Sequence, residues 1–285
     1  MKSLHHKTLA VCIFTVLGGL FSPPITPINP RVMATSSLSF SGYEWNVKTT
    51  SGSLGGPGPN YFNDSNENVW VDASGYLHLR ITYDSINEIW YCAEVYSIDS
   101  FGYGTYTFTL APGFEDLDKN VVLGLFTYLD DFNEIDIEFA RWGDENASNG
   151  QFVLQPSWKP NHKERFEFDP QGFDSNHSFT WCKNSIDFSS NNGKLERYSW
   201  QFFGLGVPKP SIEKARMNLW LMQGLVPSNG FESEVVVKSF EFMPSECTNY
   251  PLLFWWILII SVIGLSVVIF SASLFIWWKR KTIRL

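Results

Sequence analysis

The most constraining feature of the chain is a run in which acidic and apolar residues alternate. It reads Asn133-Glu-Ile-Asp-Ile-Glu-Phe139, with acids at Glu134, Asp136 and Glu138. A period of two with β-branched apolar residues is typical of a β-strand, in which residues two apart share one face. The run therefore predicts a strand that turns its isoleucines toward a core and its three carboxylates to the opposite face.

Short strand-like runs dominate residues 36–243, and turn signals rich in Gly, Pro, Asn and Asp separate them. No long amphipathic helix is visible in this region, which argues against a parallel α/β fold because that fold needs helices between its strands. Many short strands at this spacing are typical of a β-sandwich or jelly roll. We therefore expect one all-β sandwich domain over residues 36–243. The expected strands are Asn68–Asp72, Tyr76–Tyr83, Trp90–Ser97, Gly104–Leu110, Val121–Tyr128, Glu134–Phe139, Gln151–Gln155, Ser178–Trp181, Met217–Met222 and Glu232–Phe242.

Three carboxylates on one strand face are a poor choice for a purely structural strand, because like charges repel each other most where water is scarce. They suit glycosidic hydrolysis, which needs one carboxyl to protonate the leaving oxygen and a second on the other side of the sugar carbon. We expect repulsion and burial to raise at least one of their pKa values, so that a protonated acid stands beside an ionised one near neutral pH. A calcium site and a structural row are the alternatives, since carboxylate oxygens also suit hard cations.

The composition of the chain bears on which kind of molecule the protein binds. The net charge of −8 argues against nucleic acid, which needs a basic patch. Aromatic residues make up 16% of the chain, including 12 Trp, and such rings serve both as core and as flat platforms for sugars.

The cysteines give no metal-binding pattern, because no CxxC or Cys/His spacing occurs. Cys12 lies in a predicted export signal, so Cys92, Cys182 and Cys247 allow at most one intramolecular pair among them. A disulfide between Cys92 and Cys182 is one candidate.

The two termini predict the location of the protein. Residues 1–34 have a basic start, an apolar stretch and a small-residue exit, as in a secretory signal, whether cleaved or retained. Residues 252–278 carry no charge and exceed the about 20 residues that a transmembrane helix needs. The basic residues 279–285 that follow are expected to be a cytoplasmic tail. We thus expect a single-pass membrane protein whose domain lies outside the cytoplasm.

The acidic run resembles the signature of glycoside hydrolase family 16, which includes lichenases and laminarinases. Four further segments resemble parts of this family in the same order, so that the resemblance covers most of residues 40–243. They are Cys92–Glu94, Gly102–Tyr106, Phe126–Tyr128 and Asn218–Trp220. The family implies a concanavalin-like β-jelly roll with the glycan on its concave face, and a retaining mechanism. It implies Glu134 as nucleophile, Glu138 as general acid/base and Asp136 as an assisting hydrogen-bonding residue.

The resemblance also implies five substrate-binding residues: Glu94, Phe126, Phe132, Gln155 and Trp220. Glu94 matches an acid that binds a sugar hydroxyl, and a charge paired at the cleft rim is the other interpretation. Phe126 matches a cleft aromatic but serves a core equally well, and Trp220 is the best stacking candidate. Phe132 stands where lichenases have Trp.

Two departures leave the exact substrate open. Gln155 stands where a Tyr lines the lichenase cleft, and Val153 stands where an Asn does. The loop Gly52–Asn60 is expected to frame one end of the cleft, with a plain surface turn as the alternative.

Together these features predict a membrane-tethered, endo-acting hydrolase of β-1,3/β-1,4-glucan or a related polysaccharide. A cell-wall transglycosylase of the same fold and a lectin-like glycan-binding protein are the alternatives. We expect no cofactor, leaving a structural calcium ion open, and a monomer that binds a polysaccharide substrate and the membrane but no nucleic acid.

Overall fold

β-Strands form nearly all the regular structure in the computed structural model, which describes residues 36–194, 197–245 and 247. The helical segments within these ranges are two short 3₁₀ turns, η1 (Phe114–Asp116) and η2 (Met222–Gly224). The strands in chain order are β1 (Ser37–Phe40), β2 (Tyr43–Val47), β3 (Tyr61–Phe62), β4 (Val69–Val71), β5 (Leu77–Asp84), β6 (Ile89–Ser97), β7 (Gly104–Leu110), β8 (Val121–Asp130), β9 (Asn133–Phe139), β10 (Gly150–Leu154), β11 (Lys163–Phe166), β12 (Ser175–Trp181), β13 (Ser185–Asn191), β14 (Arg197–Phe203), β15 (Lys214–Leu221) and β16 (Ser233–Pro244).

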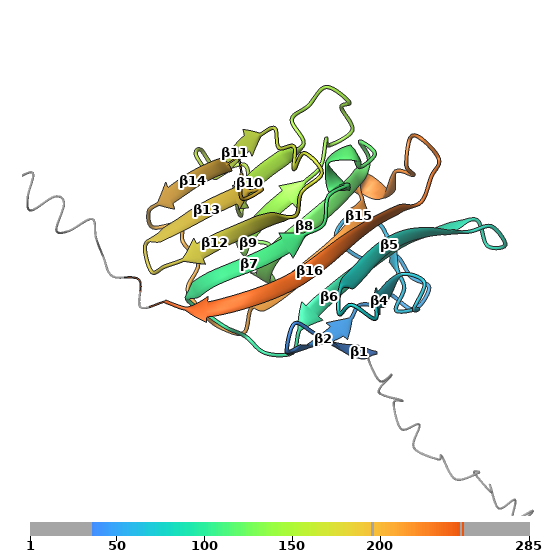
Figure 1. Ribbon diagram of the computed structural model, residues 1–285, viewed down its shortest axis with the longest axis horizontal. Coiled ribbons are helices and arrows are strands. Elements are labelled where there is room, and N and C mark those ends of the chain that lie inside the picture. The colour runs from blue at the N-terminus through green and yellow to red at the C-terminus, as the bar shows by residue number, and fades with distance from the viewer. Residues whose placement is uncertain (1–35, 195–196, 246, 248–285) are drawn as a thin grey trace, which may run out of the picture. The chain divides into compact units, whose positions relative to one another are not determined.

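The strands lie in two layers that are joined through the β5–β6 hairpin (Figure 1). One layer, called here the β9 sheet, has the order β11-β10-β9-β8-β15-β6, and β2 and β1 continue it beyond β6. The other, the β12 sheet, has the order β5-β16-β7-β12-β13-β14. Neighbouring strands along both layers are antiparallel, which is the arrangement of a β-sandwich. The expected all-β sandwich is therefore confirmed.

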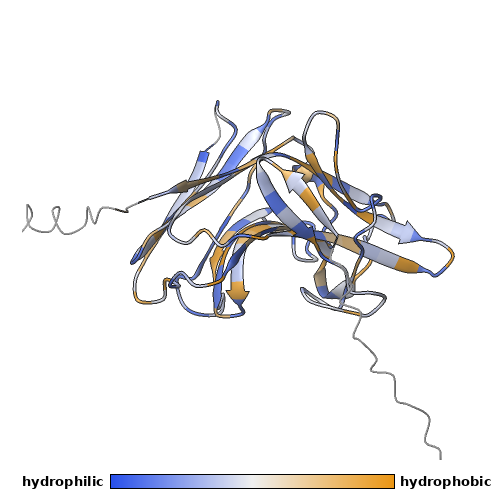
Figure 2. Cartoon of the chain, turned by 90° about the horizontal axis from the view of Figure 1, so that it is seen from below, coloured by the Kyte–Doolittle hydropathy of each residue, from blue (hydrophilic) through white to orange (hydrophobic). Residues whose placement is uncertain are grey.

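An aromatic core fills the space between the two layers. Phe152 of β10 stacks on Phe188 of β13 with ring centroids 5.0 Å apart, and Phe139 of β9 meets His177 of β12 at 4.8 Å. Buried and less buried residues alternate along strands such as β7 and β13, and the colouring in Figure 2 shows polar and apolar residues along the same strands. Burying a large apolar side chain contributes about 1.5–3 kcal/mol, so the inward turn of the apolar residues fixes which face of each strand points outward.

Strand β9 illustrates this constraint. Ile135 and Ile137 are fully buried in the core, as the alternation predicts. A register shift of one residue would turn both isoleucines to solvent and all three acids into the core. The acids are therefore held on the outer face of the β9 sheet by the packing of their apolar neighbours.

The disulfide differs from the expected candidate: Cys182 pairs with Cys247, with Cα atoms 5.5 Å apart, and Cys92 is free and buried. The sheet register explains this correction. Strand β7 lies between β12 and β16, and its Gly104 faces Trp181 on one side and Pro244 on the other. The residues that follow these two strand ends therefore meet at one edge, whereas Cys92 belongs to β6 in the other sheet.

The predicted signal at 1–34, the transmembrane helix at 252–278 and the basic tail at 279–285 lie outside the described residues, so they stay predictions. In the part of the chain that the structure describes, no helix has the length and apolarity needed to cross a membrane.

Candidate active site

The outer face of the β9 sheet carries polar side chains in rows that cross several strands. Residues that face one another in register lie side by side, and residues two apart on a strand share this face. One row runs through Arg165, Gln151, Glu138, Gly124, Asn218 and Glu94, from β11 to β6. The next row runs through Lys163, Val153, Asp136, Phe126, Arg216 and Tyr96. In a third row, Glu134 faces Tyr128 of β8.

A cavity of about 360 Å³ opens over these rows. It brings together the three acids of β9 with three of the predicted substrate-binding residues, namely Glu94, Phe126 and Trp220. Gly56 and Pro57 also line it, so the loop Gly52–Asn60 frames the site as expected. This loop is fastened at its base, because the Asn60 amide donates to the carbonyl of Leu221 at the end of β15 (2.8 Å).

The three acids are partly or wholly removed from water. Asp136 is only 3% exposed, while Glu134 and Glu138 are half-buried at the cavity wall. Burial raises the pKa of Glu134 to about 8, with the charges of Glu138 and Asp131 adding to the effect, and the hydrogen bond with Asp136 and the charge of Arg216 opposing it.

The other two acids have raised pKa values as well. Burial raises the pKa of Glu138 to about 7 against the opposing hydrogen bond from Gln151 (Nε2 to Oε2, 2.6 Å) and the charges of Lys163 and Arg165. Burial and the charges of its two neighbours raise the pKa of Asp136 well above its usual range. The pKa values of all three acids are thus raised, as the sequence predicted, so the row holds at least one proton near neutral pH.

Glu94 sits at the far end of the same face and is fully paired. Its two oxygens bind Lys48 Nζ (2.8 Å) and an Arg216 guanidinium nitrogen (2.6 Å). Arg216 lies over the rings of Tyr96 and Tyr128, at 5.1 and 4.9 Å from their centroids. The second of the two interpretations of Glu94, a charge paired in the cleft, thus describes its contacts, although the side chain also lines the cavity.

Asn218 is a residue that the sequence reasoning did not single out. It is 2% exposed, it lines the cavity, and its Oδ1 has no hydrogen-bond partner among the described residues. A buried acceptor without a partner costs about 1–3 kcal/mol, so this oxygen is ready for a donor from a ligand. The opposite residue on β8 is Gly124, where a Cβ would stand 2.5 Å from the same oxygen. The glycine therefore makes room for this amide.

Other cavity residues were also missed: Lys48, Tyr128, Asp131 and Arg216. The alternation of strands could have found two of them, because Tyr128 lies two residues from Phe126, and Arg216 lies four residues from Trp220. Lys48 carries no comparable signal, since its position depends on how distant strands pair, whereas Asp131 lies in the tight turn between β8 and β9.

Two predicted substrate-binding residues lie outside the cavity wall. Phe132, 65% exposed, is in the turn between β8 and β9. Gln155 follows β10, and its amide reaches Asp136 Oδ2 at 3.5 Å, the outer limit of a hydrogen bond. Val153 is fully buried opposite Asp136.

Trp142 packs edge-on against Trp220 with centroids 6.1 Å apart.

The described residues contain no group of three or more His, Cys, Asp or Glu side chains arranged to hold a metal ion.

No family model matches the chain. A β-glucanase of Bacillus amyloliquefaciens is 28% identical over 163 residues, which are 54% of this chain and 62% of that protein. The chain thus matches less than two thirds of the length of this curated relative.

Two solved structures share the fold. The β-glucanase of Bacillus licheniformis superimposes with a TM-score of 0.54 at 22% identity, covering 70% of this chain and 92% of the other. Rv0315 of Mycobacterium tuberculosis, described as an immunostimulatory antigen and pseudo β-1,3-glucanase, superimposes with a TM-score of 0.54 at 20% identity, covering 71% and 91%. In its acidic motif, its sequence over about half its length and its fold over 70% of it, the chain is similar to the β-glucanases of glycoside hydrolase family 16.

Proposed function

We propose that the protein is an endo-acting glycoside hydrolase that cleaves β-1,3- or β-1,4-linked glucan with retention of configuration. The observation that carries this proposal is the row of three carboxyls with raised pKa values at the wall of a cavity. The fold by itself does not decide the activity, since its neighbours include both a β-glucanase and a protein described as a pseudo-glucanase. The row of acids supports the hydrolase over a protein that only binds glycan.

The roles of the three carboxyls follow the family resemblance, and their surroundings bear on each role. Asp136 is the most deeply buried of the three acids, so it stays protonated. Its carboxyl donates a hydrogen bond to the Glu134 carboxylate. This hydrogen bond and the charge of Arg216 both favour the ionised form of Glu134, which a nucleophile needs. The match to the family motif assigns Glu138 as the general acid, and its pKa, which burial raises to about 7, leaves it able to donate a proton below that pH.

The reaction then follows two steps. Glu138 protonates the leaving glycosidic oxygen while Glu134 attacks the sugar carbon and forms a glycosyl-enzyme. Ionised Glu138 next takes a proton from water, which attacks the same carbon and releases Glu134. A glycosyl acceptor in place of this water would give transglycosylation.

The remaining cavity groups suit a sugar. Trp220 offers a half-buried aromatic surface, and Asn218 Oδ1 offers an acceptor for a hydroxyl. Gln155 and Val153 replace the polar residues expected of lichenases, which leaves the linkage to be found by experiment.

We also propose that this domain faces outward on a membrane tether. The support is the sequence alone: the uncharged residues 252–278, the basic residues 279–285 and the signal-like residues 1–34. Carbonate extraction of membranes and protease digestion of intact cells test the tether and the orientation.

The test of the activity uses the full-length chain with lichenan, laminarin, agarose and xyloglucan, and the variant Glu138→Gln as the matched control. New reducing ends from lichenan or laminarin, absent with the variant, are expected. A redistribution of chain lengths without new reducing ends would instead show a transglycosylase. Binding without any change in the glycan would show a lectin-like protein and would overturn the proposal.

A further inference from the structure

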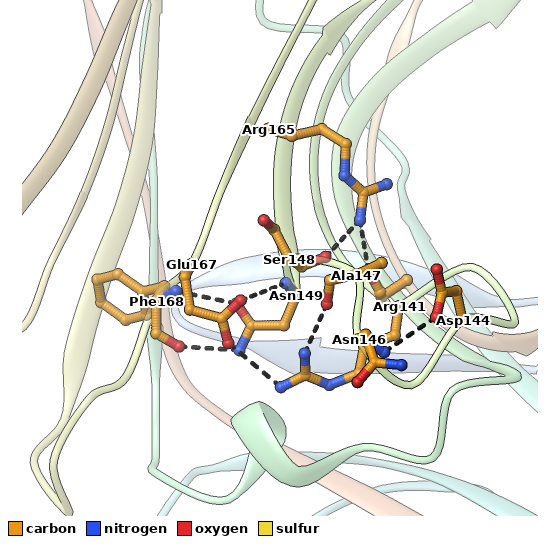
Figure 3. A network of polar contacts seen from close by, with 10 residues as sticks. Arg141, Asp144, Asn146, Ala147, Ser148, Asn149, Arg165, Glu167 and Phe168 are labelled. Atoms are coloured by element: carbon orange, nitrogen blue, oxygen red, sulfur yellow. Dashed lines mark hydrogen bonds and ion pairs between the residues drawn. The ribbon is translucent and has the colours of Figure 1, made fainter.

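Behind Glu138, on the side away from the cavity's aromatic residues, lies the side chain of Arg165 on β11. Its guanidinium donates to three oxygens: Gln151 Oε1 (3.3 Å), the carbonyl of Ala140 (3.4 Å) and the carbonyl of Ser148. Ala140 follows β9 directly, and Ser148 lies two residues before β10 begins at Gly150. Figure 3 shows Arg165 reaching this loop from above. One side chain thus joins the two ends of the loop to Gln151.

The contact between Arg165 and Gln151 determines how the Gln151 amide is oriented. A guanidinium has only donors, so the atom of Gln151 that it meets must be the carbonyl oxygen. The amide NH₂ then points the other way, to Glu138 Oε2 at 2.6 Å. A proton on Oε2 would clash with the amide hydrogen that Gln151 directs at this atom. Oε2 therefore accepts a hydrogen bond, and the proton of neutral Glu138 must be on Oε1.

We propose that Arg165 is a positioning residue for the general acid: through Gln151 it orients the Glu138 carboxyl and assigns the transferable proton to Oε1. This inference rests on the proposed function. In the acid step the Oε1–H bond breaks and a bond from this proton to the leaving oxygen forms, while the C–O bond breaks with its electron pair on that oxygen. Glu138 is left as a carboxylate that Gln151 still holds at Oε2.

Few other charges face Glu138. On its own strand stand Glu134 and Asp136, and on β11 stand Lys163 and Arg165. From β8 and β15 the same row presents the uncharged Gly124 and Asn218. Loss of Arg165 therefore removes one of two nearby cations and also frees the Gln151 amide to turn its oxygen toward Glu138. Both changes oppose ionisation of Glu138.

Arg141 provides a matched control. It fastens the same loop, because it donates to the carbonyl of Ala147 (2.6 Å) and pairs with Glu167 (3.2 Å), as Figure 3 shows. None of its hydrogen bonds or ion pairs in the described structure reaches Gln151 or Glu138. Arg141→Met thus removes a loop contact without breaking the path to the acid.

The first experiment compares the full-length protein with Arg165→Met, Arg165→Lys, Gln151→Leu and Arg141→Met on lichenan and on a 2,4-dinitrophenyl β-glucan disaccharide. We expect kcat/KM for lichenan to fall roughly 10- to 100-fold in Arg165→Met and Gln151→Leu. The loss should shrink to about twofold or less with the dinitrophenolate leaving group, which needs little protonation. Arg141→Met should leave kcat/KM unchanged on both substrates.

Lysine separates charge from orientation. Arg165→Lys should keep the high-pH limb of the kcat/KM profile in place, whereas Arg165→Met should move it up by roughly half to one pH unit. Equal behaviour of Arg165→Met and Arg141→Met on both substrates would overturn the inference. If Arg165→Met does not fold, Gln151→Leu breaks the same path, and wild-type leaving-group dependence in that variant would overturn it equally.

A second measurement needs no activity. A ¹³C NMR titration of the glutamate carboxyls, assigned with Glu138→Gln, should give Glu138 a midpoint near pH 7. We expect this midpoint to move up by roughly one pH unit in Arg165→Met and not in Arg141→Met. A shift without cleavage of any glycan would reject the proposed hydrolase and keep the positioning role. Normal cleavage with an unchanged Glu138 midpoint would keep the proposed hydrolase and reject the positioning role of Arg165.

Discussion

Buried or half-buried acidic residues occur at two places on the outer face of the β9 sheet. At one place cations pair with the acid, and at the other no cation among the described residues forms an ion pair with the acids. At the β6 end, Glu94 is 1% exposed, and a cation binds each of its carboxylate oxygens. At the β9 end, Glu134, Asp136 and Glu138 stand in a row, where neutral side chains hydrogen-bond two of them and burial raises the pKa of all three.

The difference separates an acid suited to stabilising the fold from acids suited to the proposed chemistry. A buried carboxylate that pairs with two cations is held in position, so Glu94 is suited to holding Lys48 and Arg216 at the cavity wall. A row of unpaired carboxyls costs free energy of folding, but it keeps protons available near neutral pH. The two regions should therefore respond in opposite directions when a negative charge is removed.

The largest effect is expected on activity at the β9 end. Glu134→Ala and Glu138→Ala should each lower kcat/KM on the cleaved glucan by roughly 10³- to 10⁴-fold, because the proposed nucleophile and general acid are lost. Both proteins should remain folded, as circular dichroism will show. If both variants cleaved the glucan at the wild-type rate, the acid row would not be the catalytic site.

Azide distinguishes the two roles. It should restore turnover to Glu134→Gly by replacing the nucleophile at the sugar carbon, and the glycosyl azide should have the inverted configuration. Absence of this product would weaken the assignment of Glu134.

Removal of the charge at the β6 end should chiefly affect stability. Glu94→Gln leaves Lys48 and Arg216 without their carboxylate and should lower the free energy of unfolding by about 3 kcal/mol, since breaking a buried pair leaves charge uncompensated. Urea denaturation at pH 7 measures this loss. A change below about 1 kcal/mol would mean that water already screens the two cations.

How much of these two regions the sequence predicts depends on the range of the interactions. Strand β9 and the outward turn of its acids follow from local alternation, and the structure agrees. The pairing of Glu94 does not, because Lys48 and Arg216 lie 46 and 122 residues away from it in the chain. Only the pairing of β2, β6 and β15 brings them together.

The expected strands leave out β1, β2, β3, β11, β13 and β14, and the lack of a local signal explains part of this difference. Strand β14 is an edge strand with mostly exposed residues, so it lacks the alternation that reveals β9. Strand β3 has only two residues. The partner of Cys182 is set by the position of β7 between β12 and β16, which no local pattern encodes.

The acid row should make stability fall with rising pH. The folded-state pKa of Glu134, about 8, exceeds its usual 4.5, so the folded chain binds more protons between these values. Stability from this group is therefore present below about pH 4.5 and is lost as pH rises through about 8. Glu134→Gln should match wild type near pH 4.5 and become more stable by on the order of 2 kcal/mol at pH 9.

Thermal denaturation of both proteins between pH 4.5 and 9 checks this, and their difference cancels the contribution of groups that both share. A variant less stable than wild type at pH 9 would contradict the idea that the row stores unfavourable charge, and the contrast with Glu94 would fail.

The smallest effect concerns the space between the two regions, where Gly124 separates Glu138 from Asn218. A Cβ at this position would stand 2.5 Å from Asn218 Oδ1, so Gly124→Ala must displace the amide. We expect KM for the glucan to rise about tenfold, equivalent to about 1.4 kcal/mol, with little change in kcat. Asn218→Ala should act similarly, and the double variant should be no worse than either, because both changes remove one contact. Additive losses in this cycle would show that Gly124 acts on the substrate directly rather than through Asn218.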